Sequence, residues 1–308
     1  YAVPVPEQAG VSNTTVTMNA ASMNNSGFEF SATYRNRDRD FKYELSANLS
    51  TLRNRVTSLG FGTDSYISGA YITNVGQEIG QFYGWAYEGI ARTQEDLDNH
   101  ATQEGAQIGD CLYKDISGPD GKPDGKVDAN DQVVLGSGMP KIHFGLNARF
   151  EYKRFDLSIA TFGALNYHVS DDIYNSLNSC YGWGNKEVGM LDANRFSEDG
   201  STYLSNVPRT YVTNSASLGW NDLFSSRKIQ NAAYWKIANV ELGYNFPNEW
   251  FGKYVSDVRF YVSAQNLHTF TGYHGYNVDY AGGTFTPGYN FCSYPTARTF
   301  MCGVHFTF

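Results

Sequence analysis

The sequence predicts an all-β protein whose strands form an antiparallel transmembrane β-barrel, and three observations lead to that class. Strand-like segments of about nine to eleven residues, long enough to cross a bilayer when tilted, carry apolar side chains at alternate positions. Aromatic residues make up 16% of the 308 residues, and charged residues make up 18%, against about 25% in typical soluble domains. The connections between the segments are alternately short and long, as in barrels with turns at one rim and loops at the other.

The first two segments are residues 28–35 and 41–50, joined by five residues. In the second segment the odd positions are apolar, whereas the even positions include Lys42 and Glu44. Successive side chains of a strand point to opposite faces, so each segment has one apolar face and one polar face. We expect the charged residues to lie opposite lipid, in a wet interior.

The later segments repeat this pattern. Residues 142–152 and 155–163 are joined by only Lys153 and Arg154, which predicts a tight hairpin. Three more segments follow, each with one apolar parity, at 238–245, 258–265 and 300–308. Their charged members again fall on the polar parity: Arg149, Glu151, Asp156, Glu241 and Arg259.

The region between residues 69 and 115 is ambiguous. An even number of crossings must separate segments 41–50 and 142–152, and two stretches within 69–115 are candidates for them; alternatively, these stretches form a hairpin outside the membrane. Thr93, followed by acidic residues, predicts the start of a short helix. The total is eight strands, or ten with the less certain ones.

A soluble β-sandwich would show the same alternation of apolar and polar residues. It would have to place the long connections 93–141, 164–234 and 268–297 at one end, although structureless loops above about 15 residues are unusual in compact domains. This comparison favours the membrane barrel. A net charge of −8 argues against nucleic acid as a partner.

Several blocks resemble, in order, the SusC/RagA family of TonB-dependent outer-membrane transporters, among them VGQEIGQFYGWAYEGI, YWKIANVELGYNFP and VRFYVSAQNLHTFTGY. The resemblance covers nearly the whole chain. It implies that residues 1–308 are about eight to ten strands from the carboxy-terminal part of a barrel of about 22 strands. The family's plug and TonB box would be absent from this chain, the three long connections would be extracellular, and the carboxy terminus would be periplasmic.

The resemblance also implies a function. Family members import oligosaccharides or peptides together with a SusD-like surface lipoprotein, and TonB acts through the amino-terminal part. The expected partners are therefore that lipoprotein, TonB, the remainder of the same barrel, outer-membrane lipid and the substrate. A secreted all-β glycan-binding or adhesive module is the alternative. No motif for nucleophilic, phosphate or metalloprotease chemistry occurs, so we do not expect an enzyme.

The stretch DGKPDGKVDAND resembles a calcium-binding loop, in which oxygen ligands alternate around a glycine. Lys122 stands where the third ligand belongs, so an acidic turn without metal is the alternative. The candidate calcium ligands are Asp120, Asp124, the carbonyl of Lys126, Asp128 and Asp131.

Four aromatic residues on the long connections are candidates for sugar or peptide contact. Aromatic faces stack on such ligands, but the same rings can instead pack under their own loops. The candidates are Trp183, Trp220, Tyr273 and Tyr276.

Overall fold

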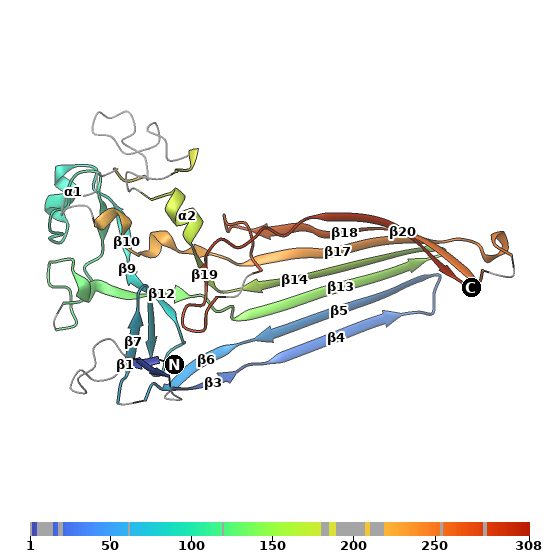
Figure 1. Ribbon diagram of the computed structural model, residues 1–308, viewed down its shortest axis with the longest axis horizontal. Coiled ribbons are helices and arrows are strands. Elements are labelled where there is room, and N and C mark those ends of the chain that lie inside the picture. The colour runs from blue at the N-terminus through green and yellow to red at the C-terminus, as the bar shows by residue number, and fades with distance from the viewer. Residues whose placement is uncertain are drawn as a thin grey trace.

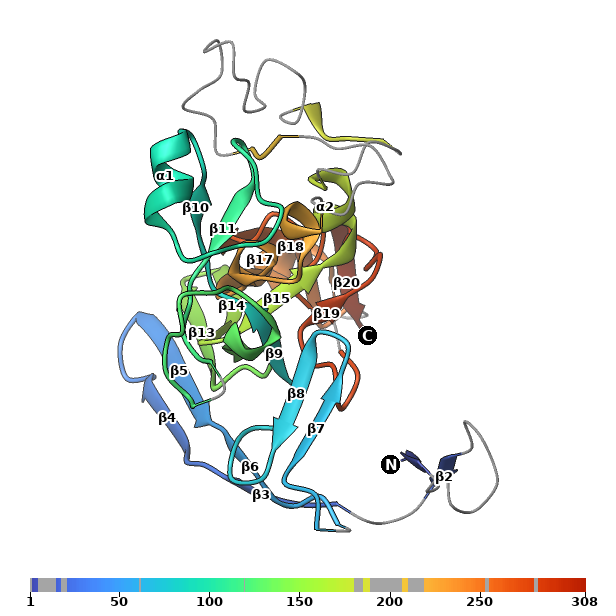
Figure 2. The ribbon, with the colours of Figure 1, turned by 90° about the vertical axis from the view of Figure 1, so that its left-hand side faces the viewer.

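The structure is a computed structural model, and it describes residues 2–4, 15–17, 21–60, 62–118, 120–179, 185–188, 207–209, 219–252, 255–279 and 282–308. Long strands fill one half of the molecule, and short strands and helices gather at one end of them (Figure 1). Viewed from that end, the short elements lie in front of the long strands (Figure 2). No helix in these ranges is long and apolar enough to span a membrane.

The long strands form one antiparallel sheet with the order β20-β18-β17-β14-β13-β5-β4. Each corresponds to a segment predicted from the alternation of apolar residues. The sheet has seven strands in the described ranges, fewer than the eight to ten expected. The strands are β4 (Glu29–Asn36), β5 (Phe41–Thr51), β13 (Ile142–Tyr152), β14 (Phe155–Leu165), β17 (Tyr234–Asn245), β18 (Asp257–Thr271) and β20 (Thr299–Thr307).

The expected crossings between residues 69 and 115 are absent from this sheet because the strands there are too short. They are β9 (Gln81–Trp85), β10 (Tyr87–Ile90) and β11 (Cys111–Tyr113). β10 pairs with β11 in a hairpin beside the other short elements (Figure 2). The alternative of a hairpin away from the long sheet is therefore the correct one, and β5 pairs directly with β13.

The two ends of the long sheet differ. The connections β4–β5, β13–β14 and β17–β18 lie at the end where the chain finishes, which we call the turn end (Figure 1). All longer connections leave from the opposite end, which we call the loop end. This arrangement follows from antiparallel pairing, because each strand that leaves a short turn must finish at the opposite end.

Small sheets and helices build the loop end. β9 pairs with β12 (Gln132–Ser137) and with β8 (Tyr71–Asn74), which pairs with β7 (Ser65–Ser68). β15 (His168–Asp171) joins β16 (Gln230–Asn231) and β19 (Tyr289–Asn290). The α-helices within the described ranges are α1 (Gln94–Asn99) and α2 (Asp172–Leu177). Thr93 caps α1 as predicted, in a capping box with Asp96.

Two further strands continue the long sheet at its edge. β3 (Ser22–Ser26) and β6 (Arg53–Ser58) pair with each other and extend β4 and β5 beyond the loop end (Figure 1). The amino-terminal β1 (Ala2–Pro4) and β2 (Thr15–Thr17) pair only with each other among the described strands. The buried apolar clusters lie among the loop-end elements, for example Val56, Leu59 and Ile79, so this end has its own small cores.

Candidate functional site: a two-faced sheet and its loop end

One face of the long sheet is apolar, and we call it the outer face. Its side chains are exposed along each strand: Phe30 is 63% exposed, Leu146 47% and Val304 48%. Register sets these side chains beside one another, since Leu146 pairs with Ala47 on one side and Thr161 on the other. A continuous exposed apolar surface of this extent is unfavourable in water and suits lipid contact.

Aromatic rings concentrate on the outer face near the turn end. Phe41 stacks on Phe150 with ring centroids 5.9 Å apart, and Phe155 contacts Tyr244 at 4.9 Å. Tyr244 also meets Phe246 at 5.1 Å. Rings at this position are typical of the interfacial girdle of a membrane barrel.

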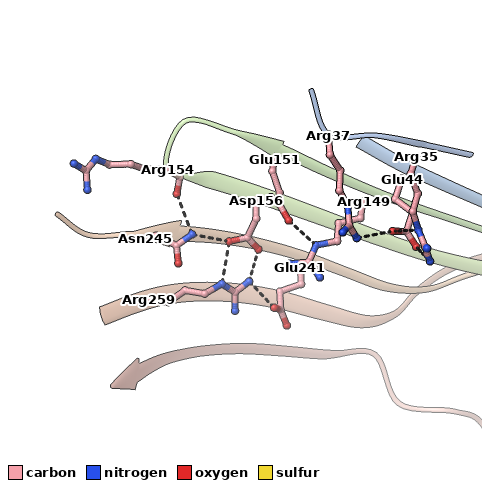
Figure 3. Close-up of polar contacts among 10 residues, drawn as sticks. All are labelled: Arg35, Arg37, Glu44, Arg149, Glu151, Arg154, Asp156, Glu241, Asn245 and Arg259. Carbon is pink, nitrogen blue, oxygen red and sulfur yellow. Dashed lines mark hydrogen bonds and ion pairs between the residues drawn. The ribbon is translucent and has the colours of Figure 1, made fainter. Parts of the chain in front are cut away.

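The opposite face, the inner face, carries a belt of charged side chains near the turn end (Figure 3). Arg259 of β18 donates to Asp156 of β14 over 3.0 Å and to Glu241 of β17 over 2.8 Å. Gly243 lies between them, and a Cβ there would come within 2.4 Å of the Arg259 guanidinium. Glycine at this position therefore lets Arg259 cross β17 to reach Asp156.

The belt continues across the remaining strands. Arg35 of β4 donates to Glu44 of β5 over 2.7 Å, and Arg149 pairs with Glu151 over 3.1 Å (Figure 3). A polar hollow of ≈360 Å³ is lined by Lys42, Glu44, Arg149 and Glu151, among others. Half-exposed ion pairs on one face of a strand sheet indicate a water-filled interior rather than a dry core.

A buried carboxylate ties distant parts of the loop end together. Asp110 is fully buried and accepts hydrogen bonds from the Arg209 guanidinium over 2.5 Å and 3.0 Å. The Asn221 amide also donates to Asp110 over 2.8 Å, while its oxygen accepts from the Cys111 N–H over 2.7 Å. A buried charge needs such partners, so this node fixes residues 207–209 and 219–222 against the β10–β11 hairpin.

A second buried node contains one of the predicted ligand-binding aromatics. The Tyr273 hydroxyl donates to Asp171, and the Asn290 amide donates to the same carboxylate over 3.0 Å. Tyr273 is only 5% exposed, and burial together with Asp171 raises the pKa of its hydroxyl, which keeps the proton in place. For Tyr273 the structure favours the bracing alternative over ligand contact.

The other three aromatics differ from one another. The Trp220 ring nitrogen donates to the Glu104 carbonyl over 2.8 Å, and its ring packs beside Tyr113, so Trp220 also braces the loop end. Tyr276 is 64% exposed. Trp183 lies outside the described residues. Tyr276 is therefore the described candidate whose ring is free to meet a ligand.

The acidic loop uses its carboxylates to hold backbone N–H groups. Asp131 is buried and accepts from Ile116 over 2.7 Å, Ser117 over 2.9 Å and Asp128 over 2.8 Å. Asp124 accepts from the Lys126 N–H, and Asp128 caps the turn that follows it. Within the described ranges no group of three His, Cys, Asp or Glu side chains is placed to hold a metal ion. Calcium binding by Asp120, Asp124, Lys126, Asp128 and Asp131 stays a prediction, which a calcium titration with calorimetric detection would test.

Sequence reasoning missed two of the buried carboxylates, Asp110 and Asp171. Asp171 immediately precedes a helix and accepts from the Tyr174 N–H, so an N-cap pattern could have found it. No such pattern marks Asp110, because its partners Arg209 and Asn221 are about a hundred residues away in sequence and are brought close only by the fold.

An antiparallel sheet with a lipid-compatible face, a charged face and unequal ends is the wall of a transmembrane β-barrel. Comparison with known proteins agrees with this assignment as a barrel wall. The chain is 30% identical to TonB-dependent receptor P3 of Formosa agariphila, an alignment that covers 99% of this chain and 30% of that receptor. It is 25% identical to TonB-dependent receptor SusC of Bacteroides thetaiotaomicron, in an alignment that covers 96% of this chain and 27% of SusC. No family model matches the chain.

Solved structures give the same fold. The RagAB peptide transporter matches with a TM-score of 0.76 at 22% identity, covering 98% of this chain and 31% of that one. The chain is thus similar over nearly its whole length to TonB-dependent receptors, SusC among them, and it shares its fold with part of the RagAB transporter. It spans about 30% of the length of the curated relatives it matches. The alternative of a secreted module does not account for the exposed outer face.

Proposed function

We propose that this chain forms part of the barrel wall and of the loop surface of an outer-membrane importer that takes up oligosaccharides or peptides. The observation that supports this most is the combination of the apolar outer face with the charged belt inside, on a chain related to TonB-dependent receptors over its whole length. The fold neighbour described as a peptide transporter makes peptide the first substrate class to test.

The orientation belongs to the same proposal. The turn end and the carboxy terminus face the periplasm, and the connections 93–141, 164–234 and 268–297 face the outside. Barrels of this kind have short periplasmic turns and longer extracellular loops, which matches the lengths at the two ends. A SusD-like lipoprotein then meets the loop end, and TonB supplies the work for transport by the full receptor.

Cysteine labelling in living cells tests the orientation. In the full receptor, Cys111, Cys180, Cys292 and Cys302 are replaced by Ser. One cysteine is then introduced as Tyr276→Cys at the loop end or Asp38→Cys at the β4–β5 turn. A membrane-impermeant maleimide should label the first in intact cells and the second only after the outer membrane is opened. Labelling of Asp38→Cys in intact cells would overturn the orientation.

Uptake measurements test the transport itself. Cells that depend on the full receptor are given labelled oligosaccharides or labelled peptides, and the TonB system is disabled in a parallel culture. We expect uptake of one class that stops without TonB. Equal uptake in the presence and absence of the receptor, for both classes, would contradict the proposal.

A further inference from the structure

The outer face does not end where its apolar residues end. In the ladder between β4 and β5, Glu29 pairs with Ser50. Between β3 and β6, Ser26 pairs with Arg53 and Asn24 pairs with Arg55, which is the same register. The ladder therefore runs from β5 into β6 without a change of face. The odd-numbered row of the outer face therefore passes from Leu49 through Thr51 to Arg53 and Arg55. Two adjacent outward positions are basic just beyond the apolar surface.

The structure fixes these two arginines outward. Asn54 is 6% exposed and Val56 2% exposed, because both point inward. Asn54 donates to Asn25 over 2.6 Å and accepts from the Ile79 N–H over 3.0 Å. Val56 packs against the Leu59 and Ile79 cluster, and its backbone bonds to residues 76 and 77. Since strand side chains alternate, Arg53 and Arg55 have no other face to occupy.

The surroundings of the two arginines favour an anion. A hollow of ≈470 Å³ lies beside them, and its lining includes Asn24, Ser26 and Thr57 but no carboxylate. No acidic side chain in the described part of the chain forms an ion pair with either arginine. Both side chains are exposed, so their charge faces whatever lies around the barrel at this height.

That height corresponds to lipid headgroups. Arg53 and Arg55 lie about 7 Å and about 13 Å along the strand beyond Thr51, which a tilt of about 40° reduces to roughly 5 Å and 10 Å along the membrane normal. The headgroup region of a leaflet occupies the first several ångströms outside the hydrocarbon core. The acyl chains of the same lipid would lie against Phe28, Phe30 and Leu49, which are exposed.

We propose that Arg53 and Arg55 bind the phosphate of a phosphorylated glycolipid in the leaflet at the loop end. Guanidinium groups bind phosphate oxygens in a bidentate manner, and the hydroxyl and amide groups opposite them supply further polar contacts. Free phosphate has no acyl chains to lie against the apolar surface, so we assign the bound phosphate to a lipid. The proposal rests on the orientation given above, which places this end in the outer leaflet.

The test uses the full receptor in detergent, titrated with lipid A and followed by native mass spectrometry. The variant is Arg53→Gln with Arg55→Gln, and the matched control is Lys42→Gln, which removes a positive charge from the inner face. Each basic side chain near an anionic lipid surface contributes enough to change binding about fivefold, so the double variant should bind lipid A about thirtyfold more weakly. The control should bind like the unaltered receptor, and both variants should keep the heat-resistant migration of a folded barrel.

Further probes distinguish the ligands. Dephosphorylated lipid A should bind the unaltered receptor as weakly as lipid A binds the double variant. Equal affinity of the double variant and the unaltered receptor for lipid A would overturn the proposal, as would an equal loss with Lys42→Gln. Displacement of lipid A by inorganic phosphate at similar concentration would show that the site takes free phosphate and not a lipid. If the double variant lost a bound acidic protein but bound lipid A normally, the arginines would belong to the site for that protein, and the proposal would fail. The cysteine-labelling experiment described under Proposed function measures the orientation independently. A reversed orientation can therefore be distinguished from a failure of lipid binding.

Discussion

At the scale of single residues, a step of one position on a long strand changes the environment completely. Leu146 and Asn147 are neighbours in β13, yet Leu146 stands on the outer face between Ala47 and Thr161, and Asn147 stands on the inner face opposite Ser46 and Ala160. Both positions lie in the middle of the strand, so depth in the membrane is nearly the same for the two. The pair therefore isolates the effect of the face.

Replacing Leu146 with Arg should impair assembly far more than replacing Asn147 with Arg. A charged side chain facing lipid near the middle of the bilayer costs roughly 2–4 kcal/mol in such barrels, whereas the inner face is wet. The measurement is the free energy of unfolding of the full receptor in lipid vesicles, together with its amount in the outer membrane. Equal effects at the two positions would show that the faces are assigned wrongly.

The two tyrosines of the loop end should respond differently to substitution. Tyr273→Phe keeps the ring but removes the hydroxyl that donates to buried Asp171, so it should lower the free energy of unfolding of the loop end by about 1–3 kcal/mol. Tyr276→Ala should leave stability unchanged and weaken substrate uptake. Thermal unfolding and uptake, measured on both variants, separate bracing from ligand contact, and a large stability loss in Tyr276→Ala would contradict the assignment.

At the scale of elements, alternation predicts the long strands well, because one face must meet lipid along their whole length. The prediction for β13 agrees with the structure at both ends, Ile142 and Tyr152. β17 differs: a bulge at Ala238 shifts its register, so that Trp235 lies outward and stacks on Phe270 at 5.3 Å while Lys236 lies inward. The bulge changes which parity faces lipid, from Trp235 and Ile237 before it to Val240 and Leu242 after it. A single parity taken from residues 238–245 therefore does not extend to the start of the strand.

For the candidate site, the sequence predicts only which face of the sheet each side chain occupies. The parity placed Glu241 and Arg259 on the polar face, but their ion pairs depend on strand order and register, which the sequence does not state. The loop-end nodes depend still more on tertiary structure, since Asp110 and Tyr273 meet partners from distant segments. The short strands β9 to β11 were ambiguous because brief apolar runs suit a crossing and a hairpin equally.

The turn around Asp131 has a predictable dependence on pH. Burial alone would raise the pKa of its carboxyl, but hydrogen bonds from the Ser117, Asp128 and Ile116 N–H groups outweigh burial and hold the pKa below its usual range. A lowered folded-state pKa contributes stability above the ordinary carboxyl pKa, and that stability is lost as pH falls through the lowered value. The protection factors of these amides, which compare their exchange with the intrinsic rate at the same pH, should therefore be high at neutral pH and fall as the pH drops through the lowered pKa. Asp131→Asn should lose most of this protection at neutral pH; unchanged protection would contradict the role given to the carboxylate.

At the scale of the whole molecule, the long connections converge on one end of a rigid sheet, where the buried nodes hold them in place (Figures 1 and 2). Binding residues commonly lie on loops carried by a rigid framework. The sheet and its loop end can therefore be altered independently, provided that the nodes remain.

Replacing residues 180–206 by a flexible linker of similar reach keeps Arg209 and its bonds to Asp110, so the barrel should still assemble. Uptake and association with the lipoprotein should both decrease if this connection builds the ligand or partner surface. Outer-membrane yield, uptake and co-purification measure the three effects, and a linker replacement of residues 37–40 at the turn end serves as the control. Survival of both uptake and association would exclude a role for residues 180–206 in either.

The direct pairing of β5 with β13 has a consequence for divergence and for engineering. Thr51 and Ile142 lie opposite each other in the ladder, although residues 52–141 separate them along the chain. Insertions and deletions within that stretch leave this pairing unchanged, as long as β6 and the buried nodes remain and the chain returns to its starting point. A foreign binding module could therefore be inserted between β6 and β13 without moving the strands of the wall.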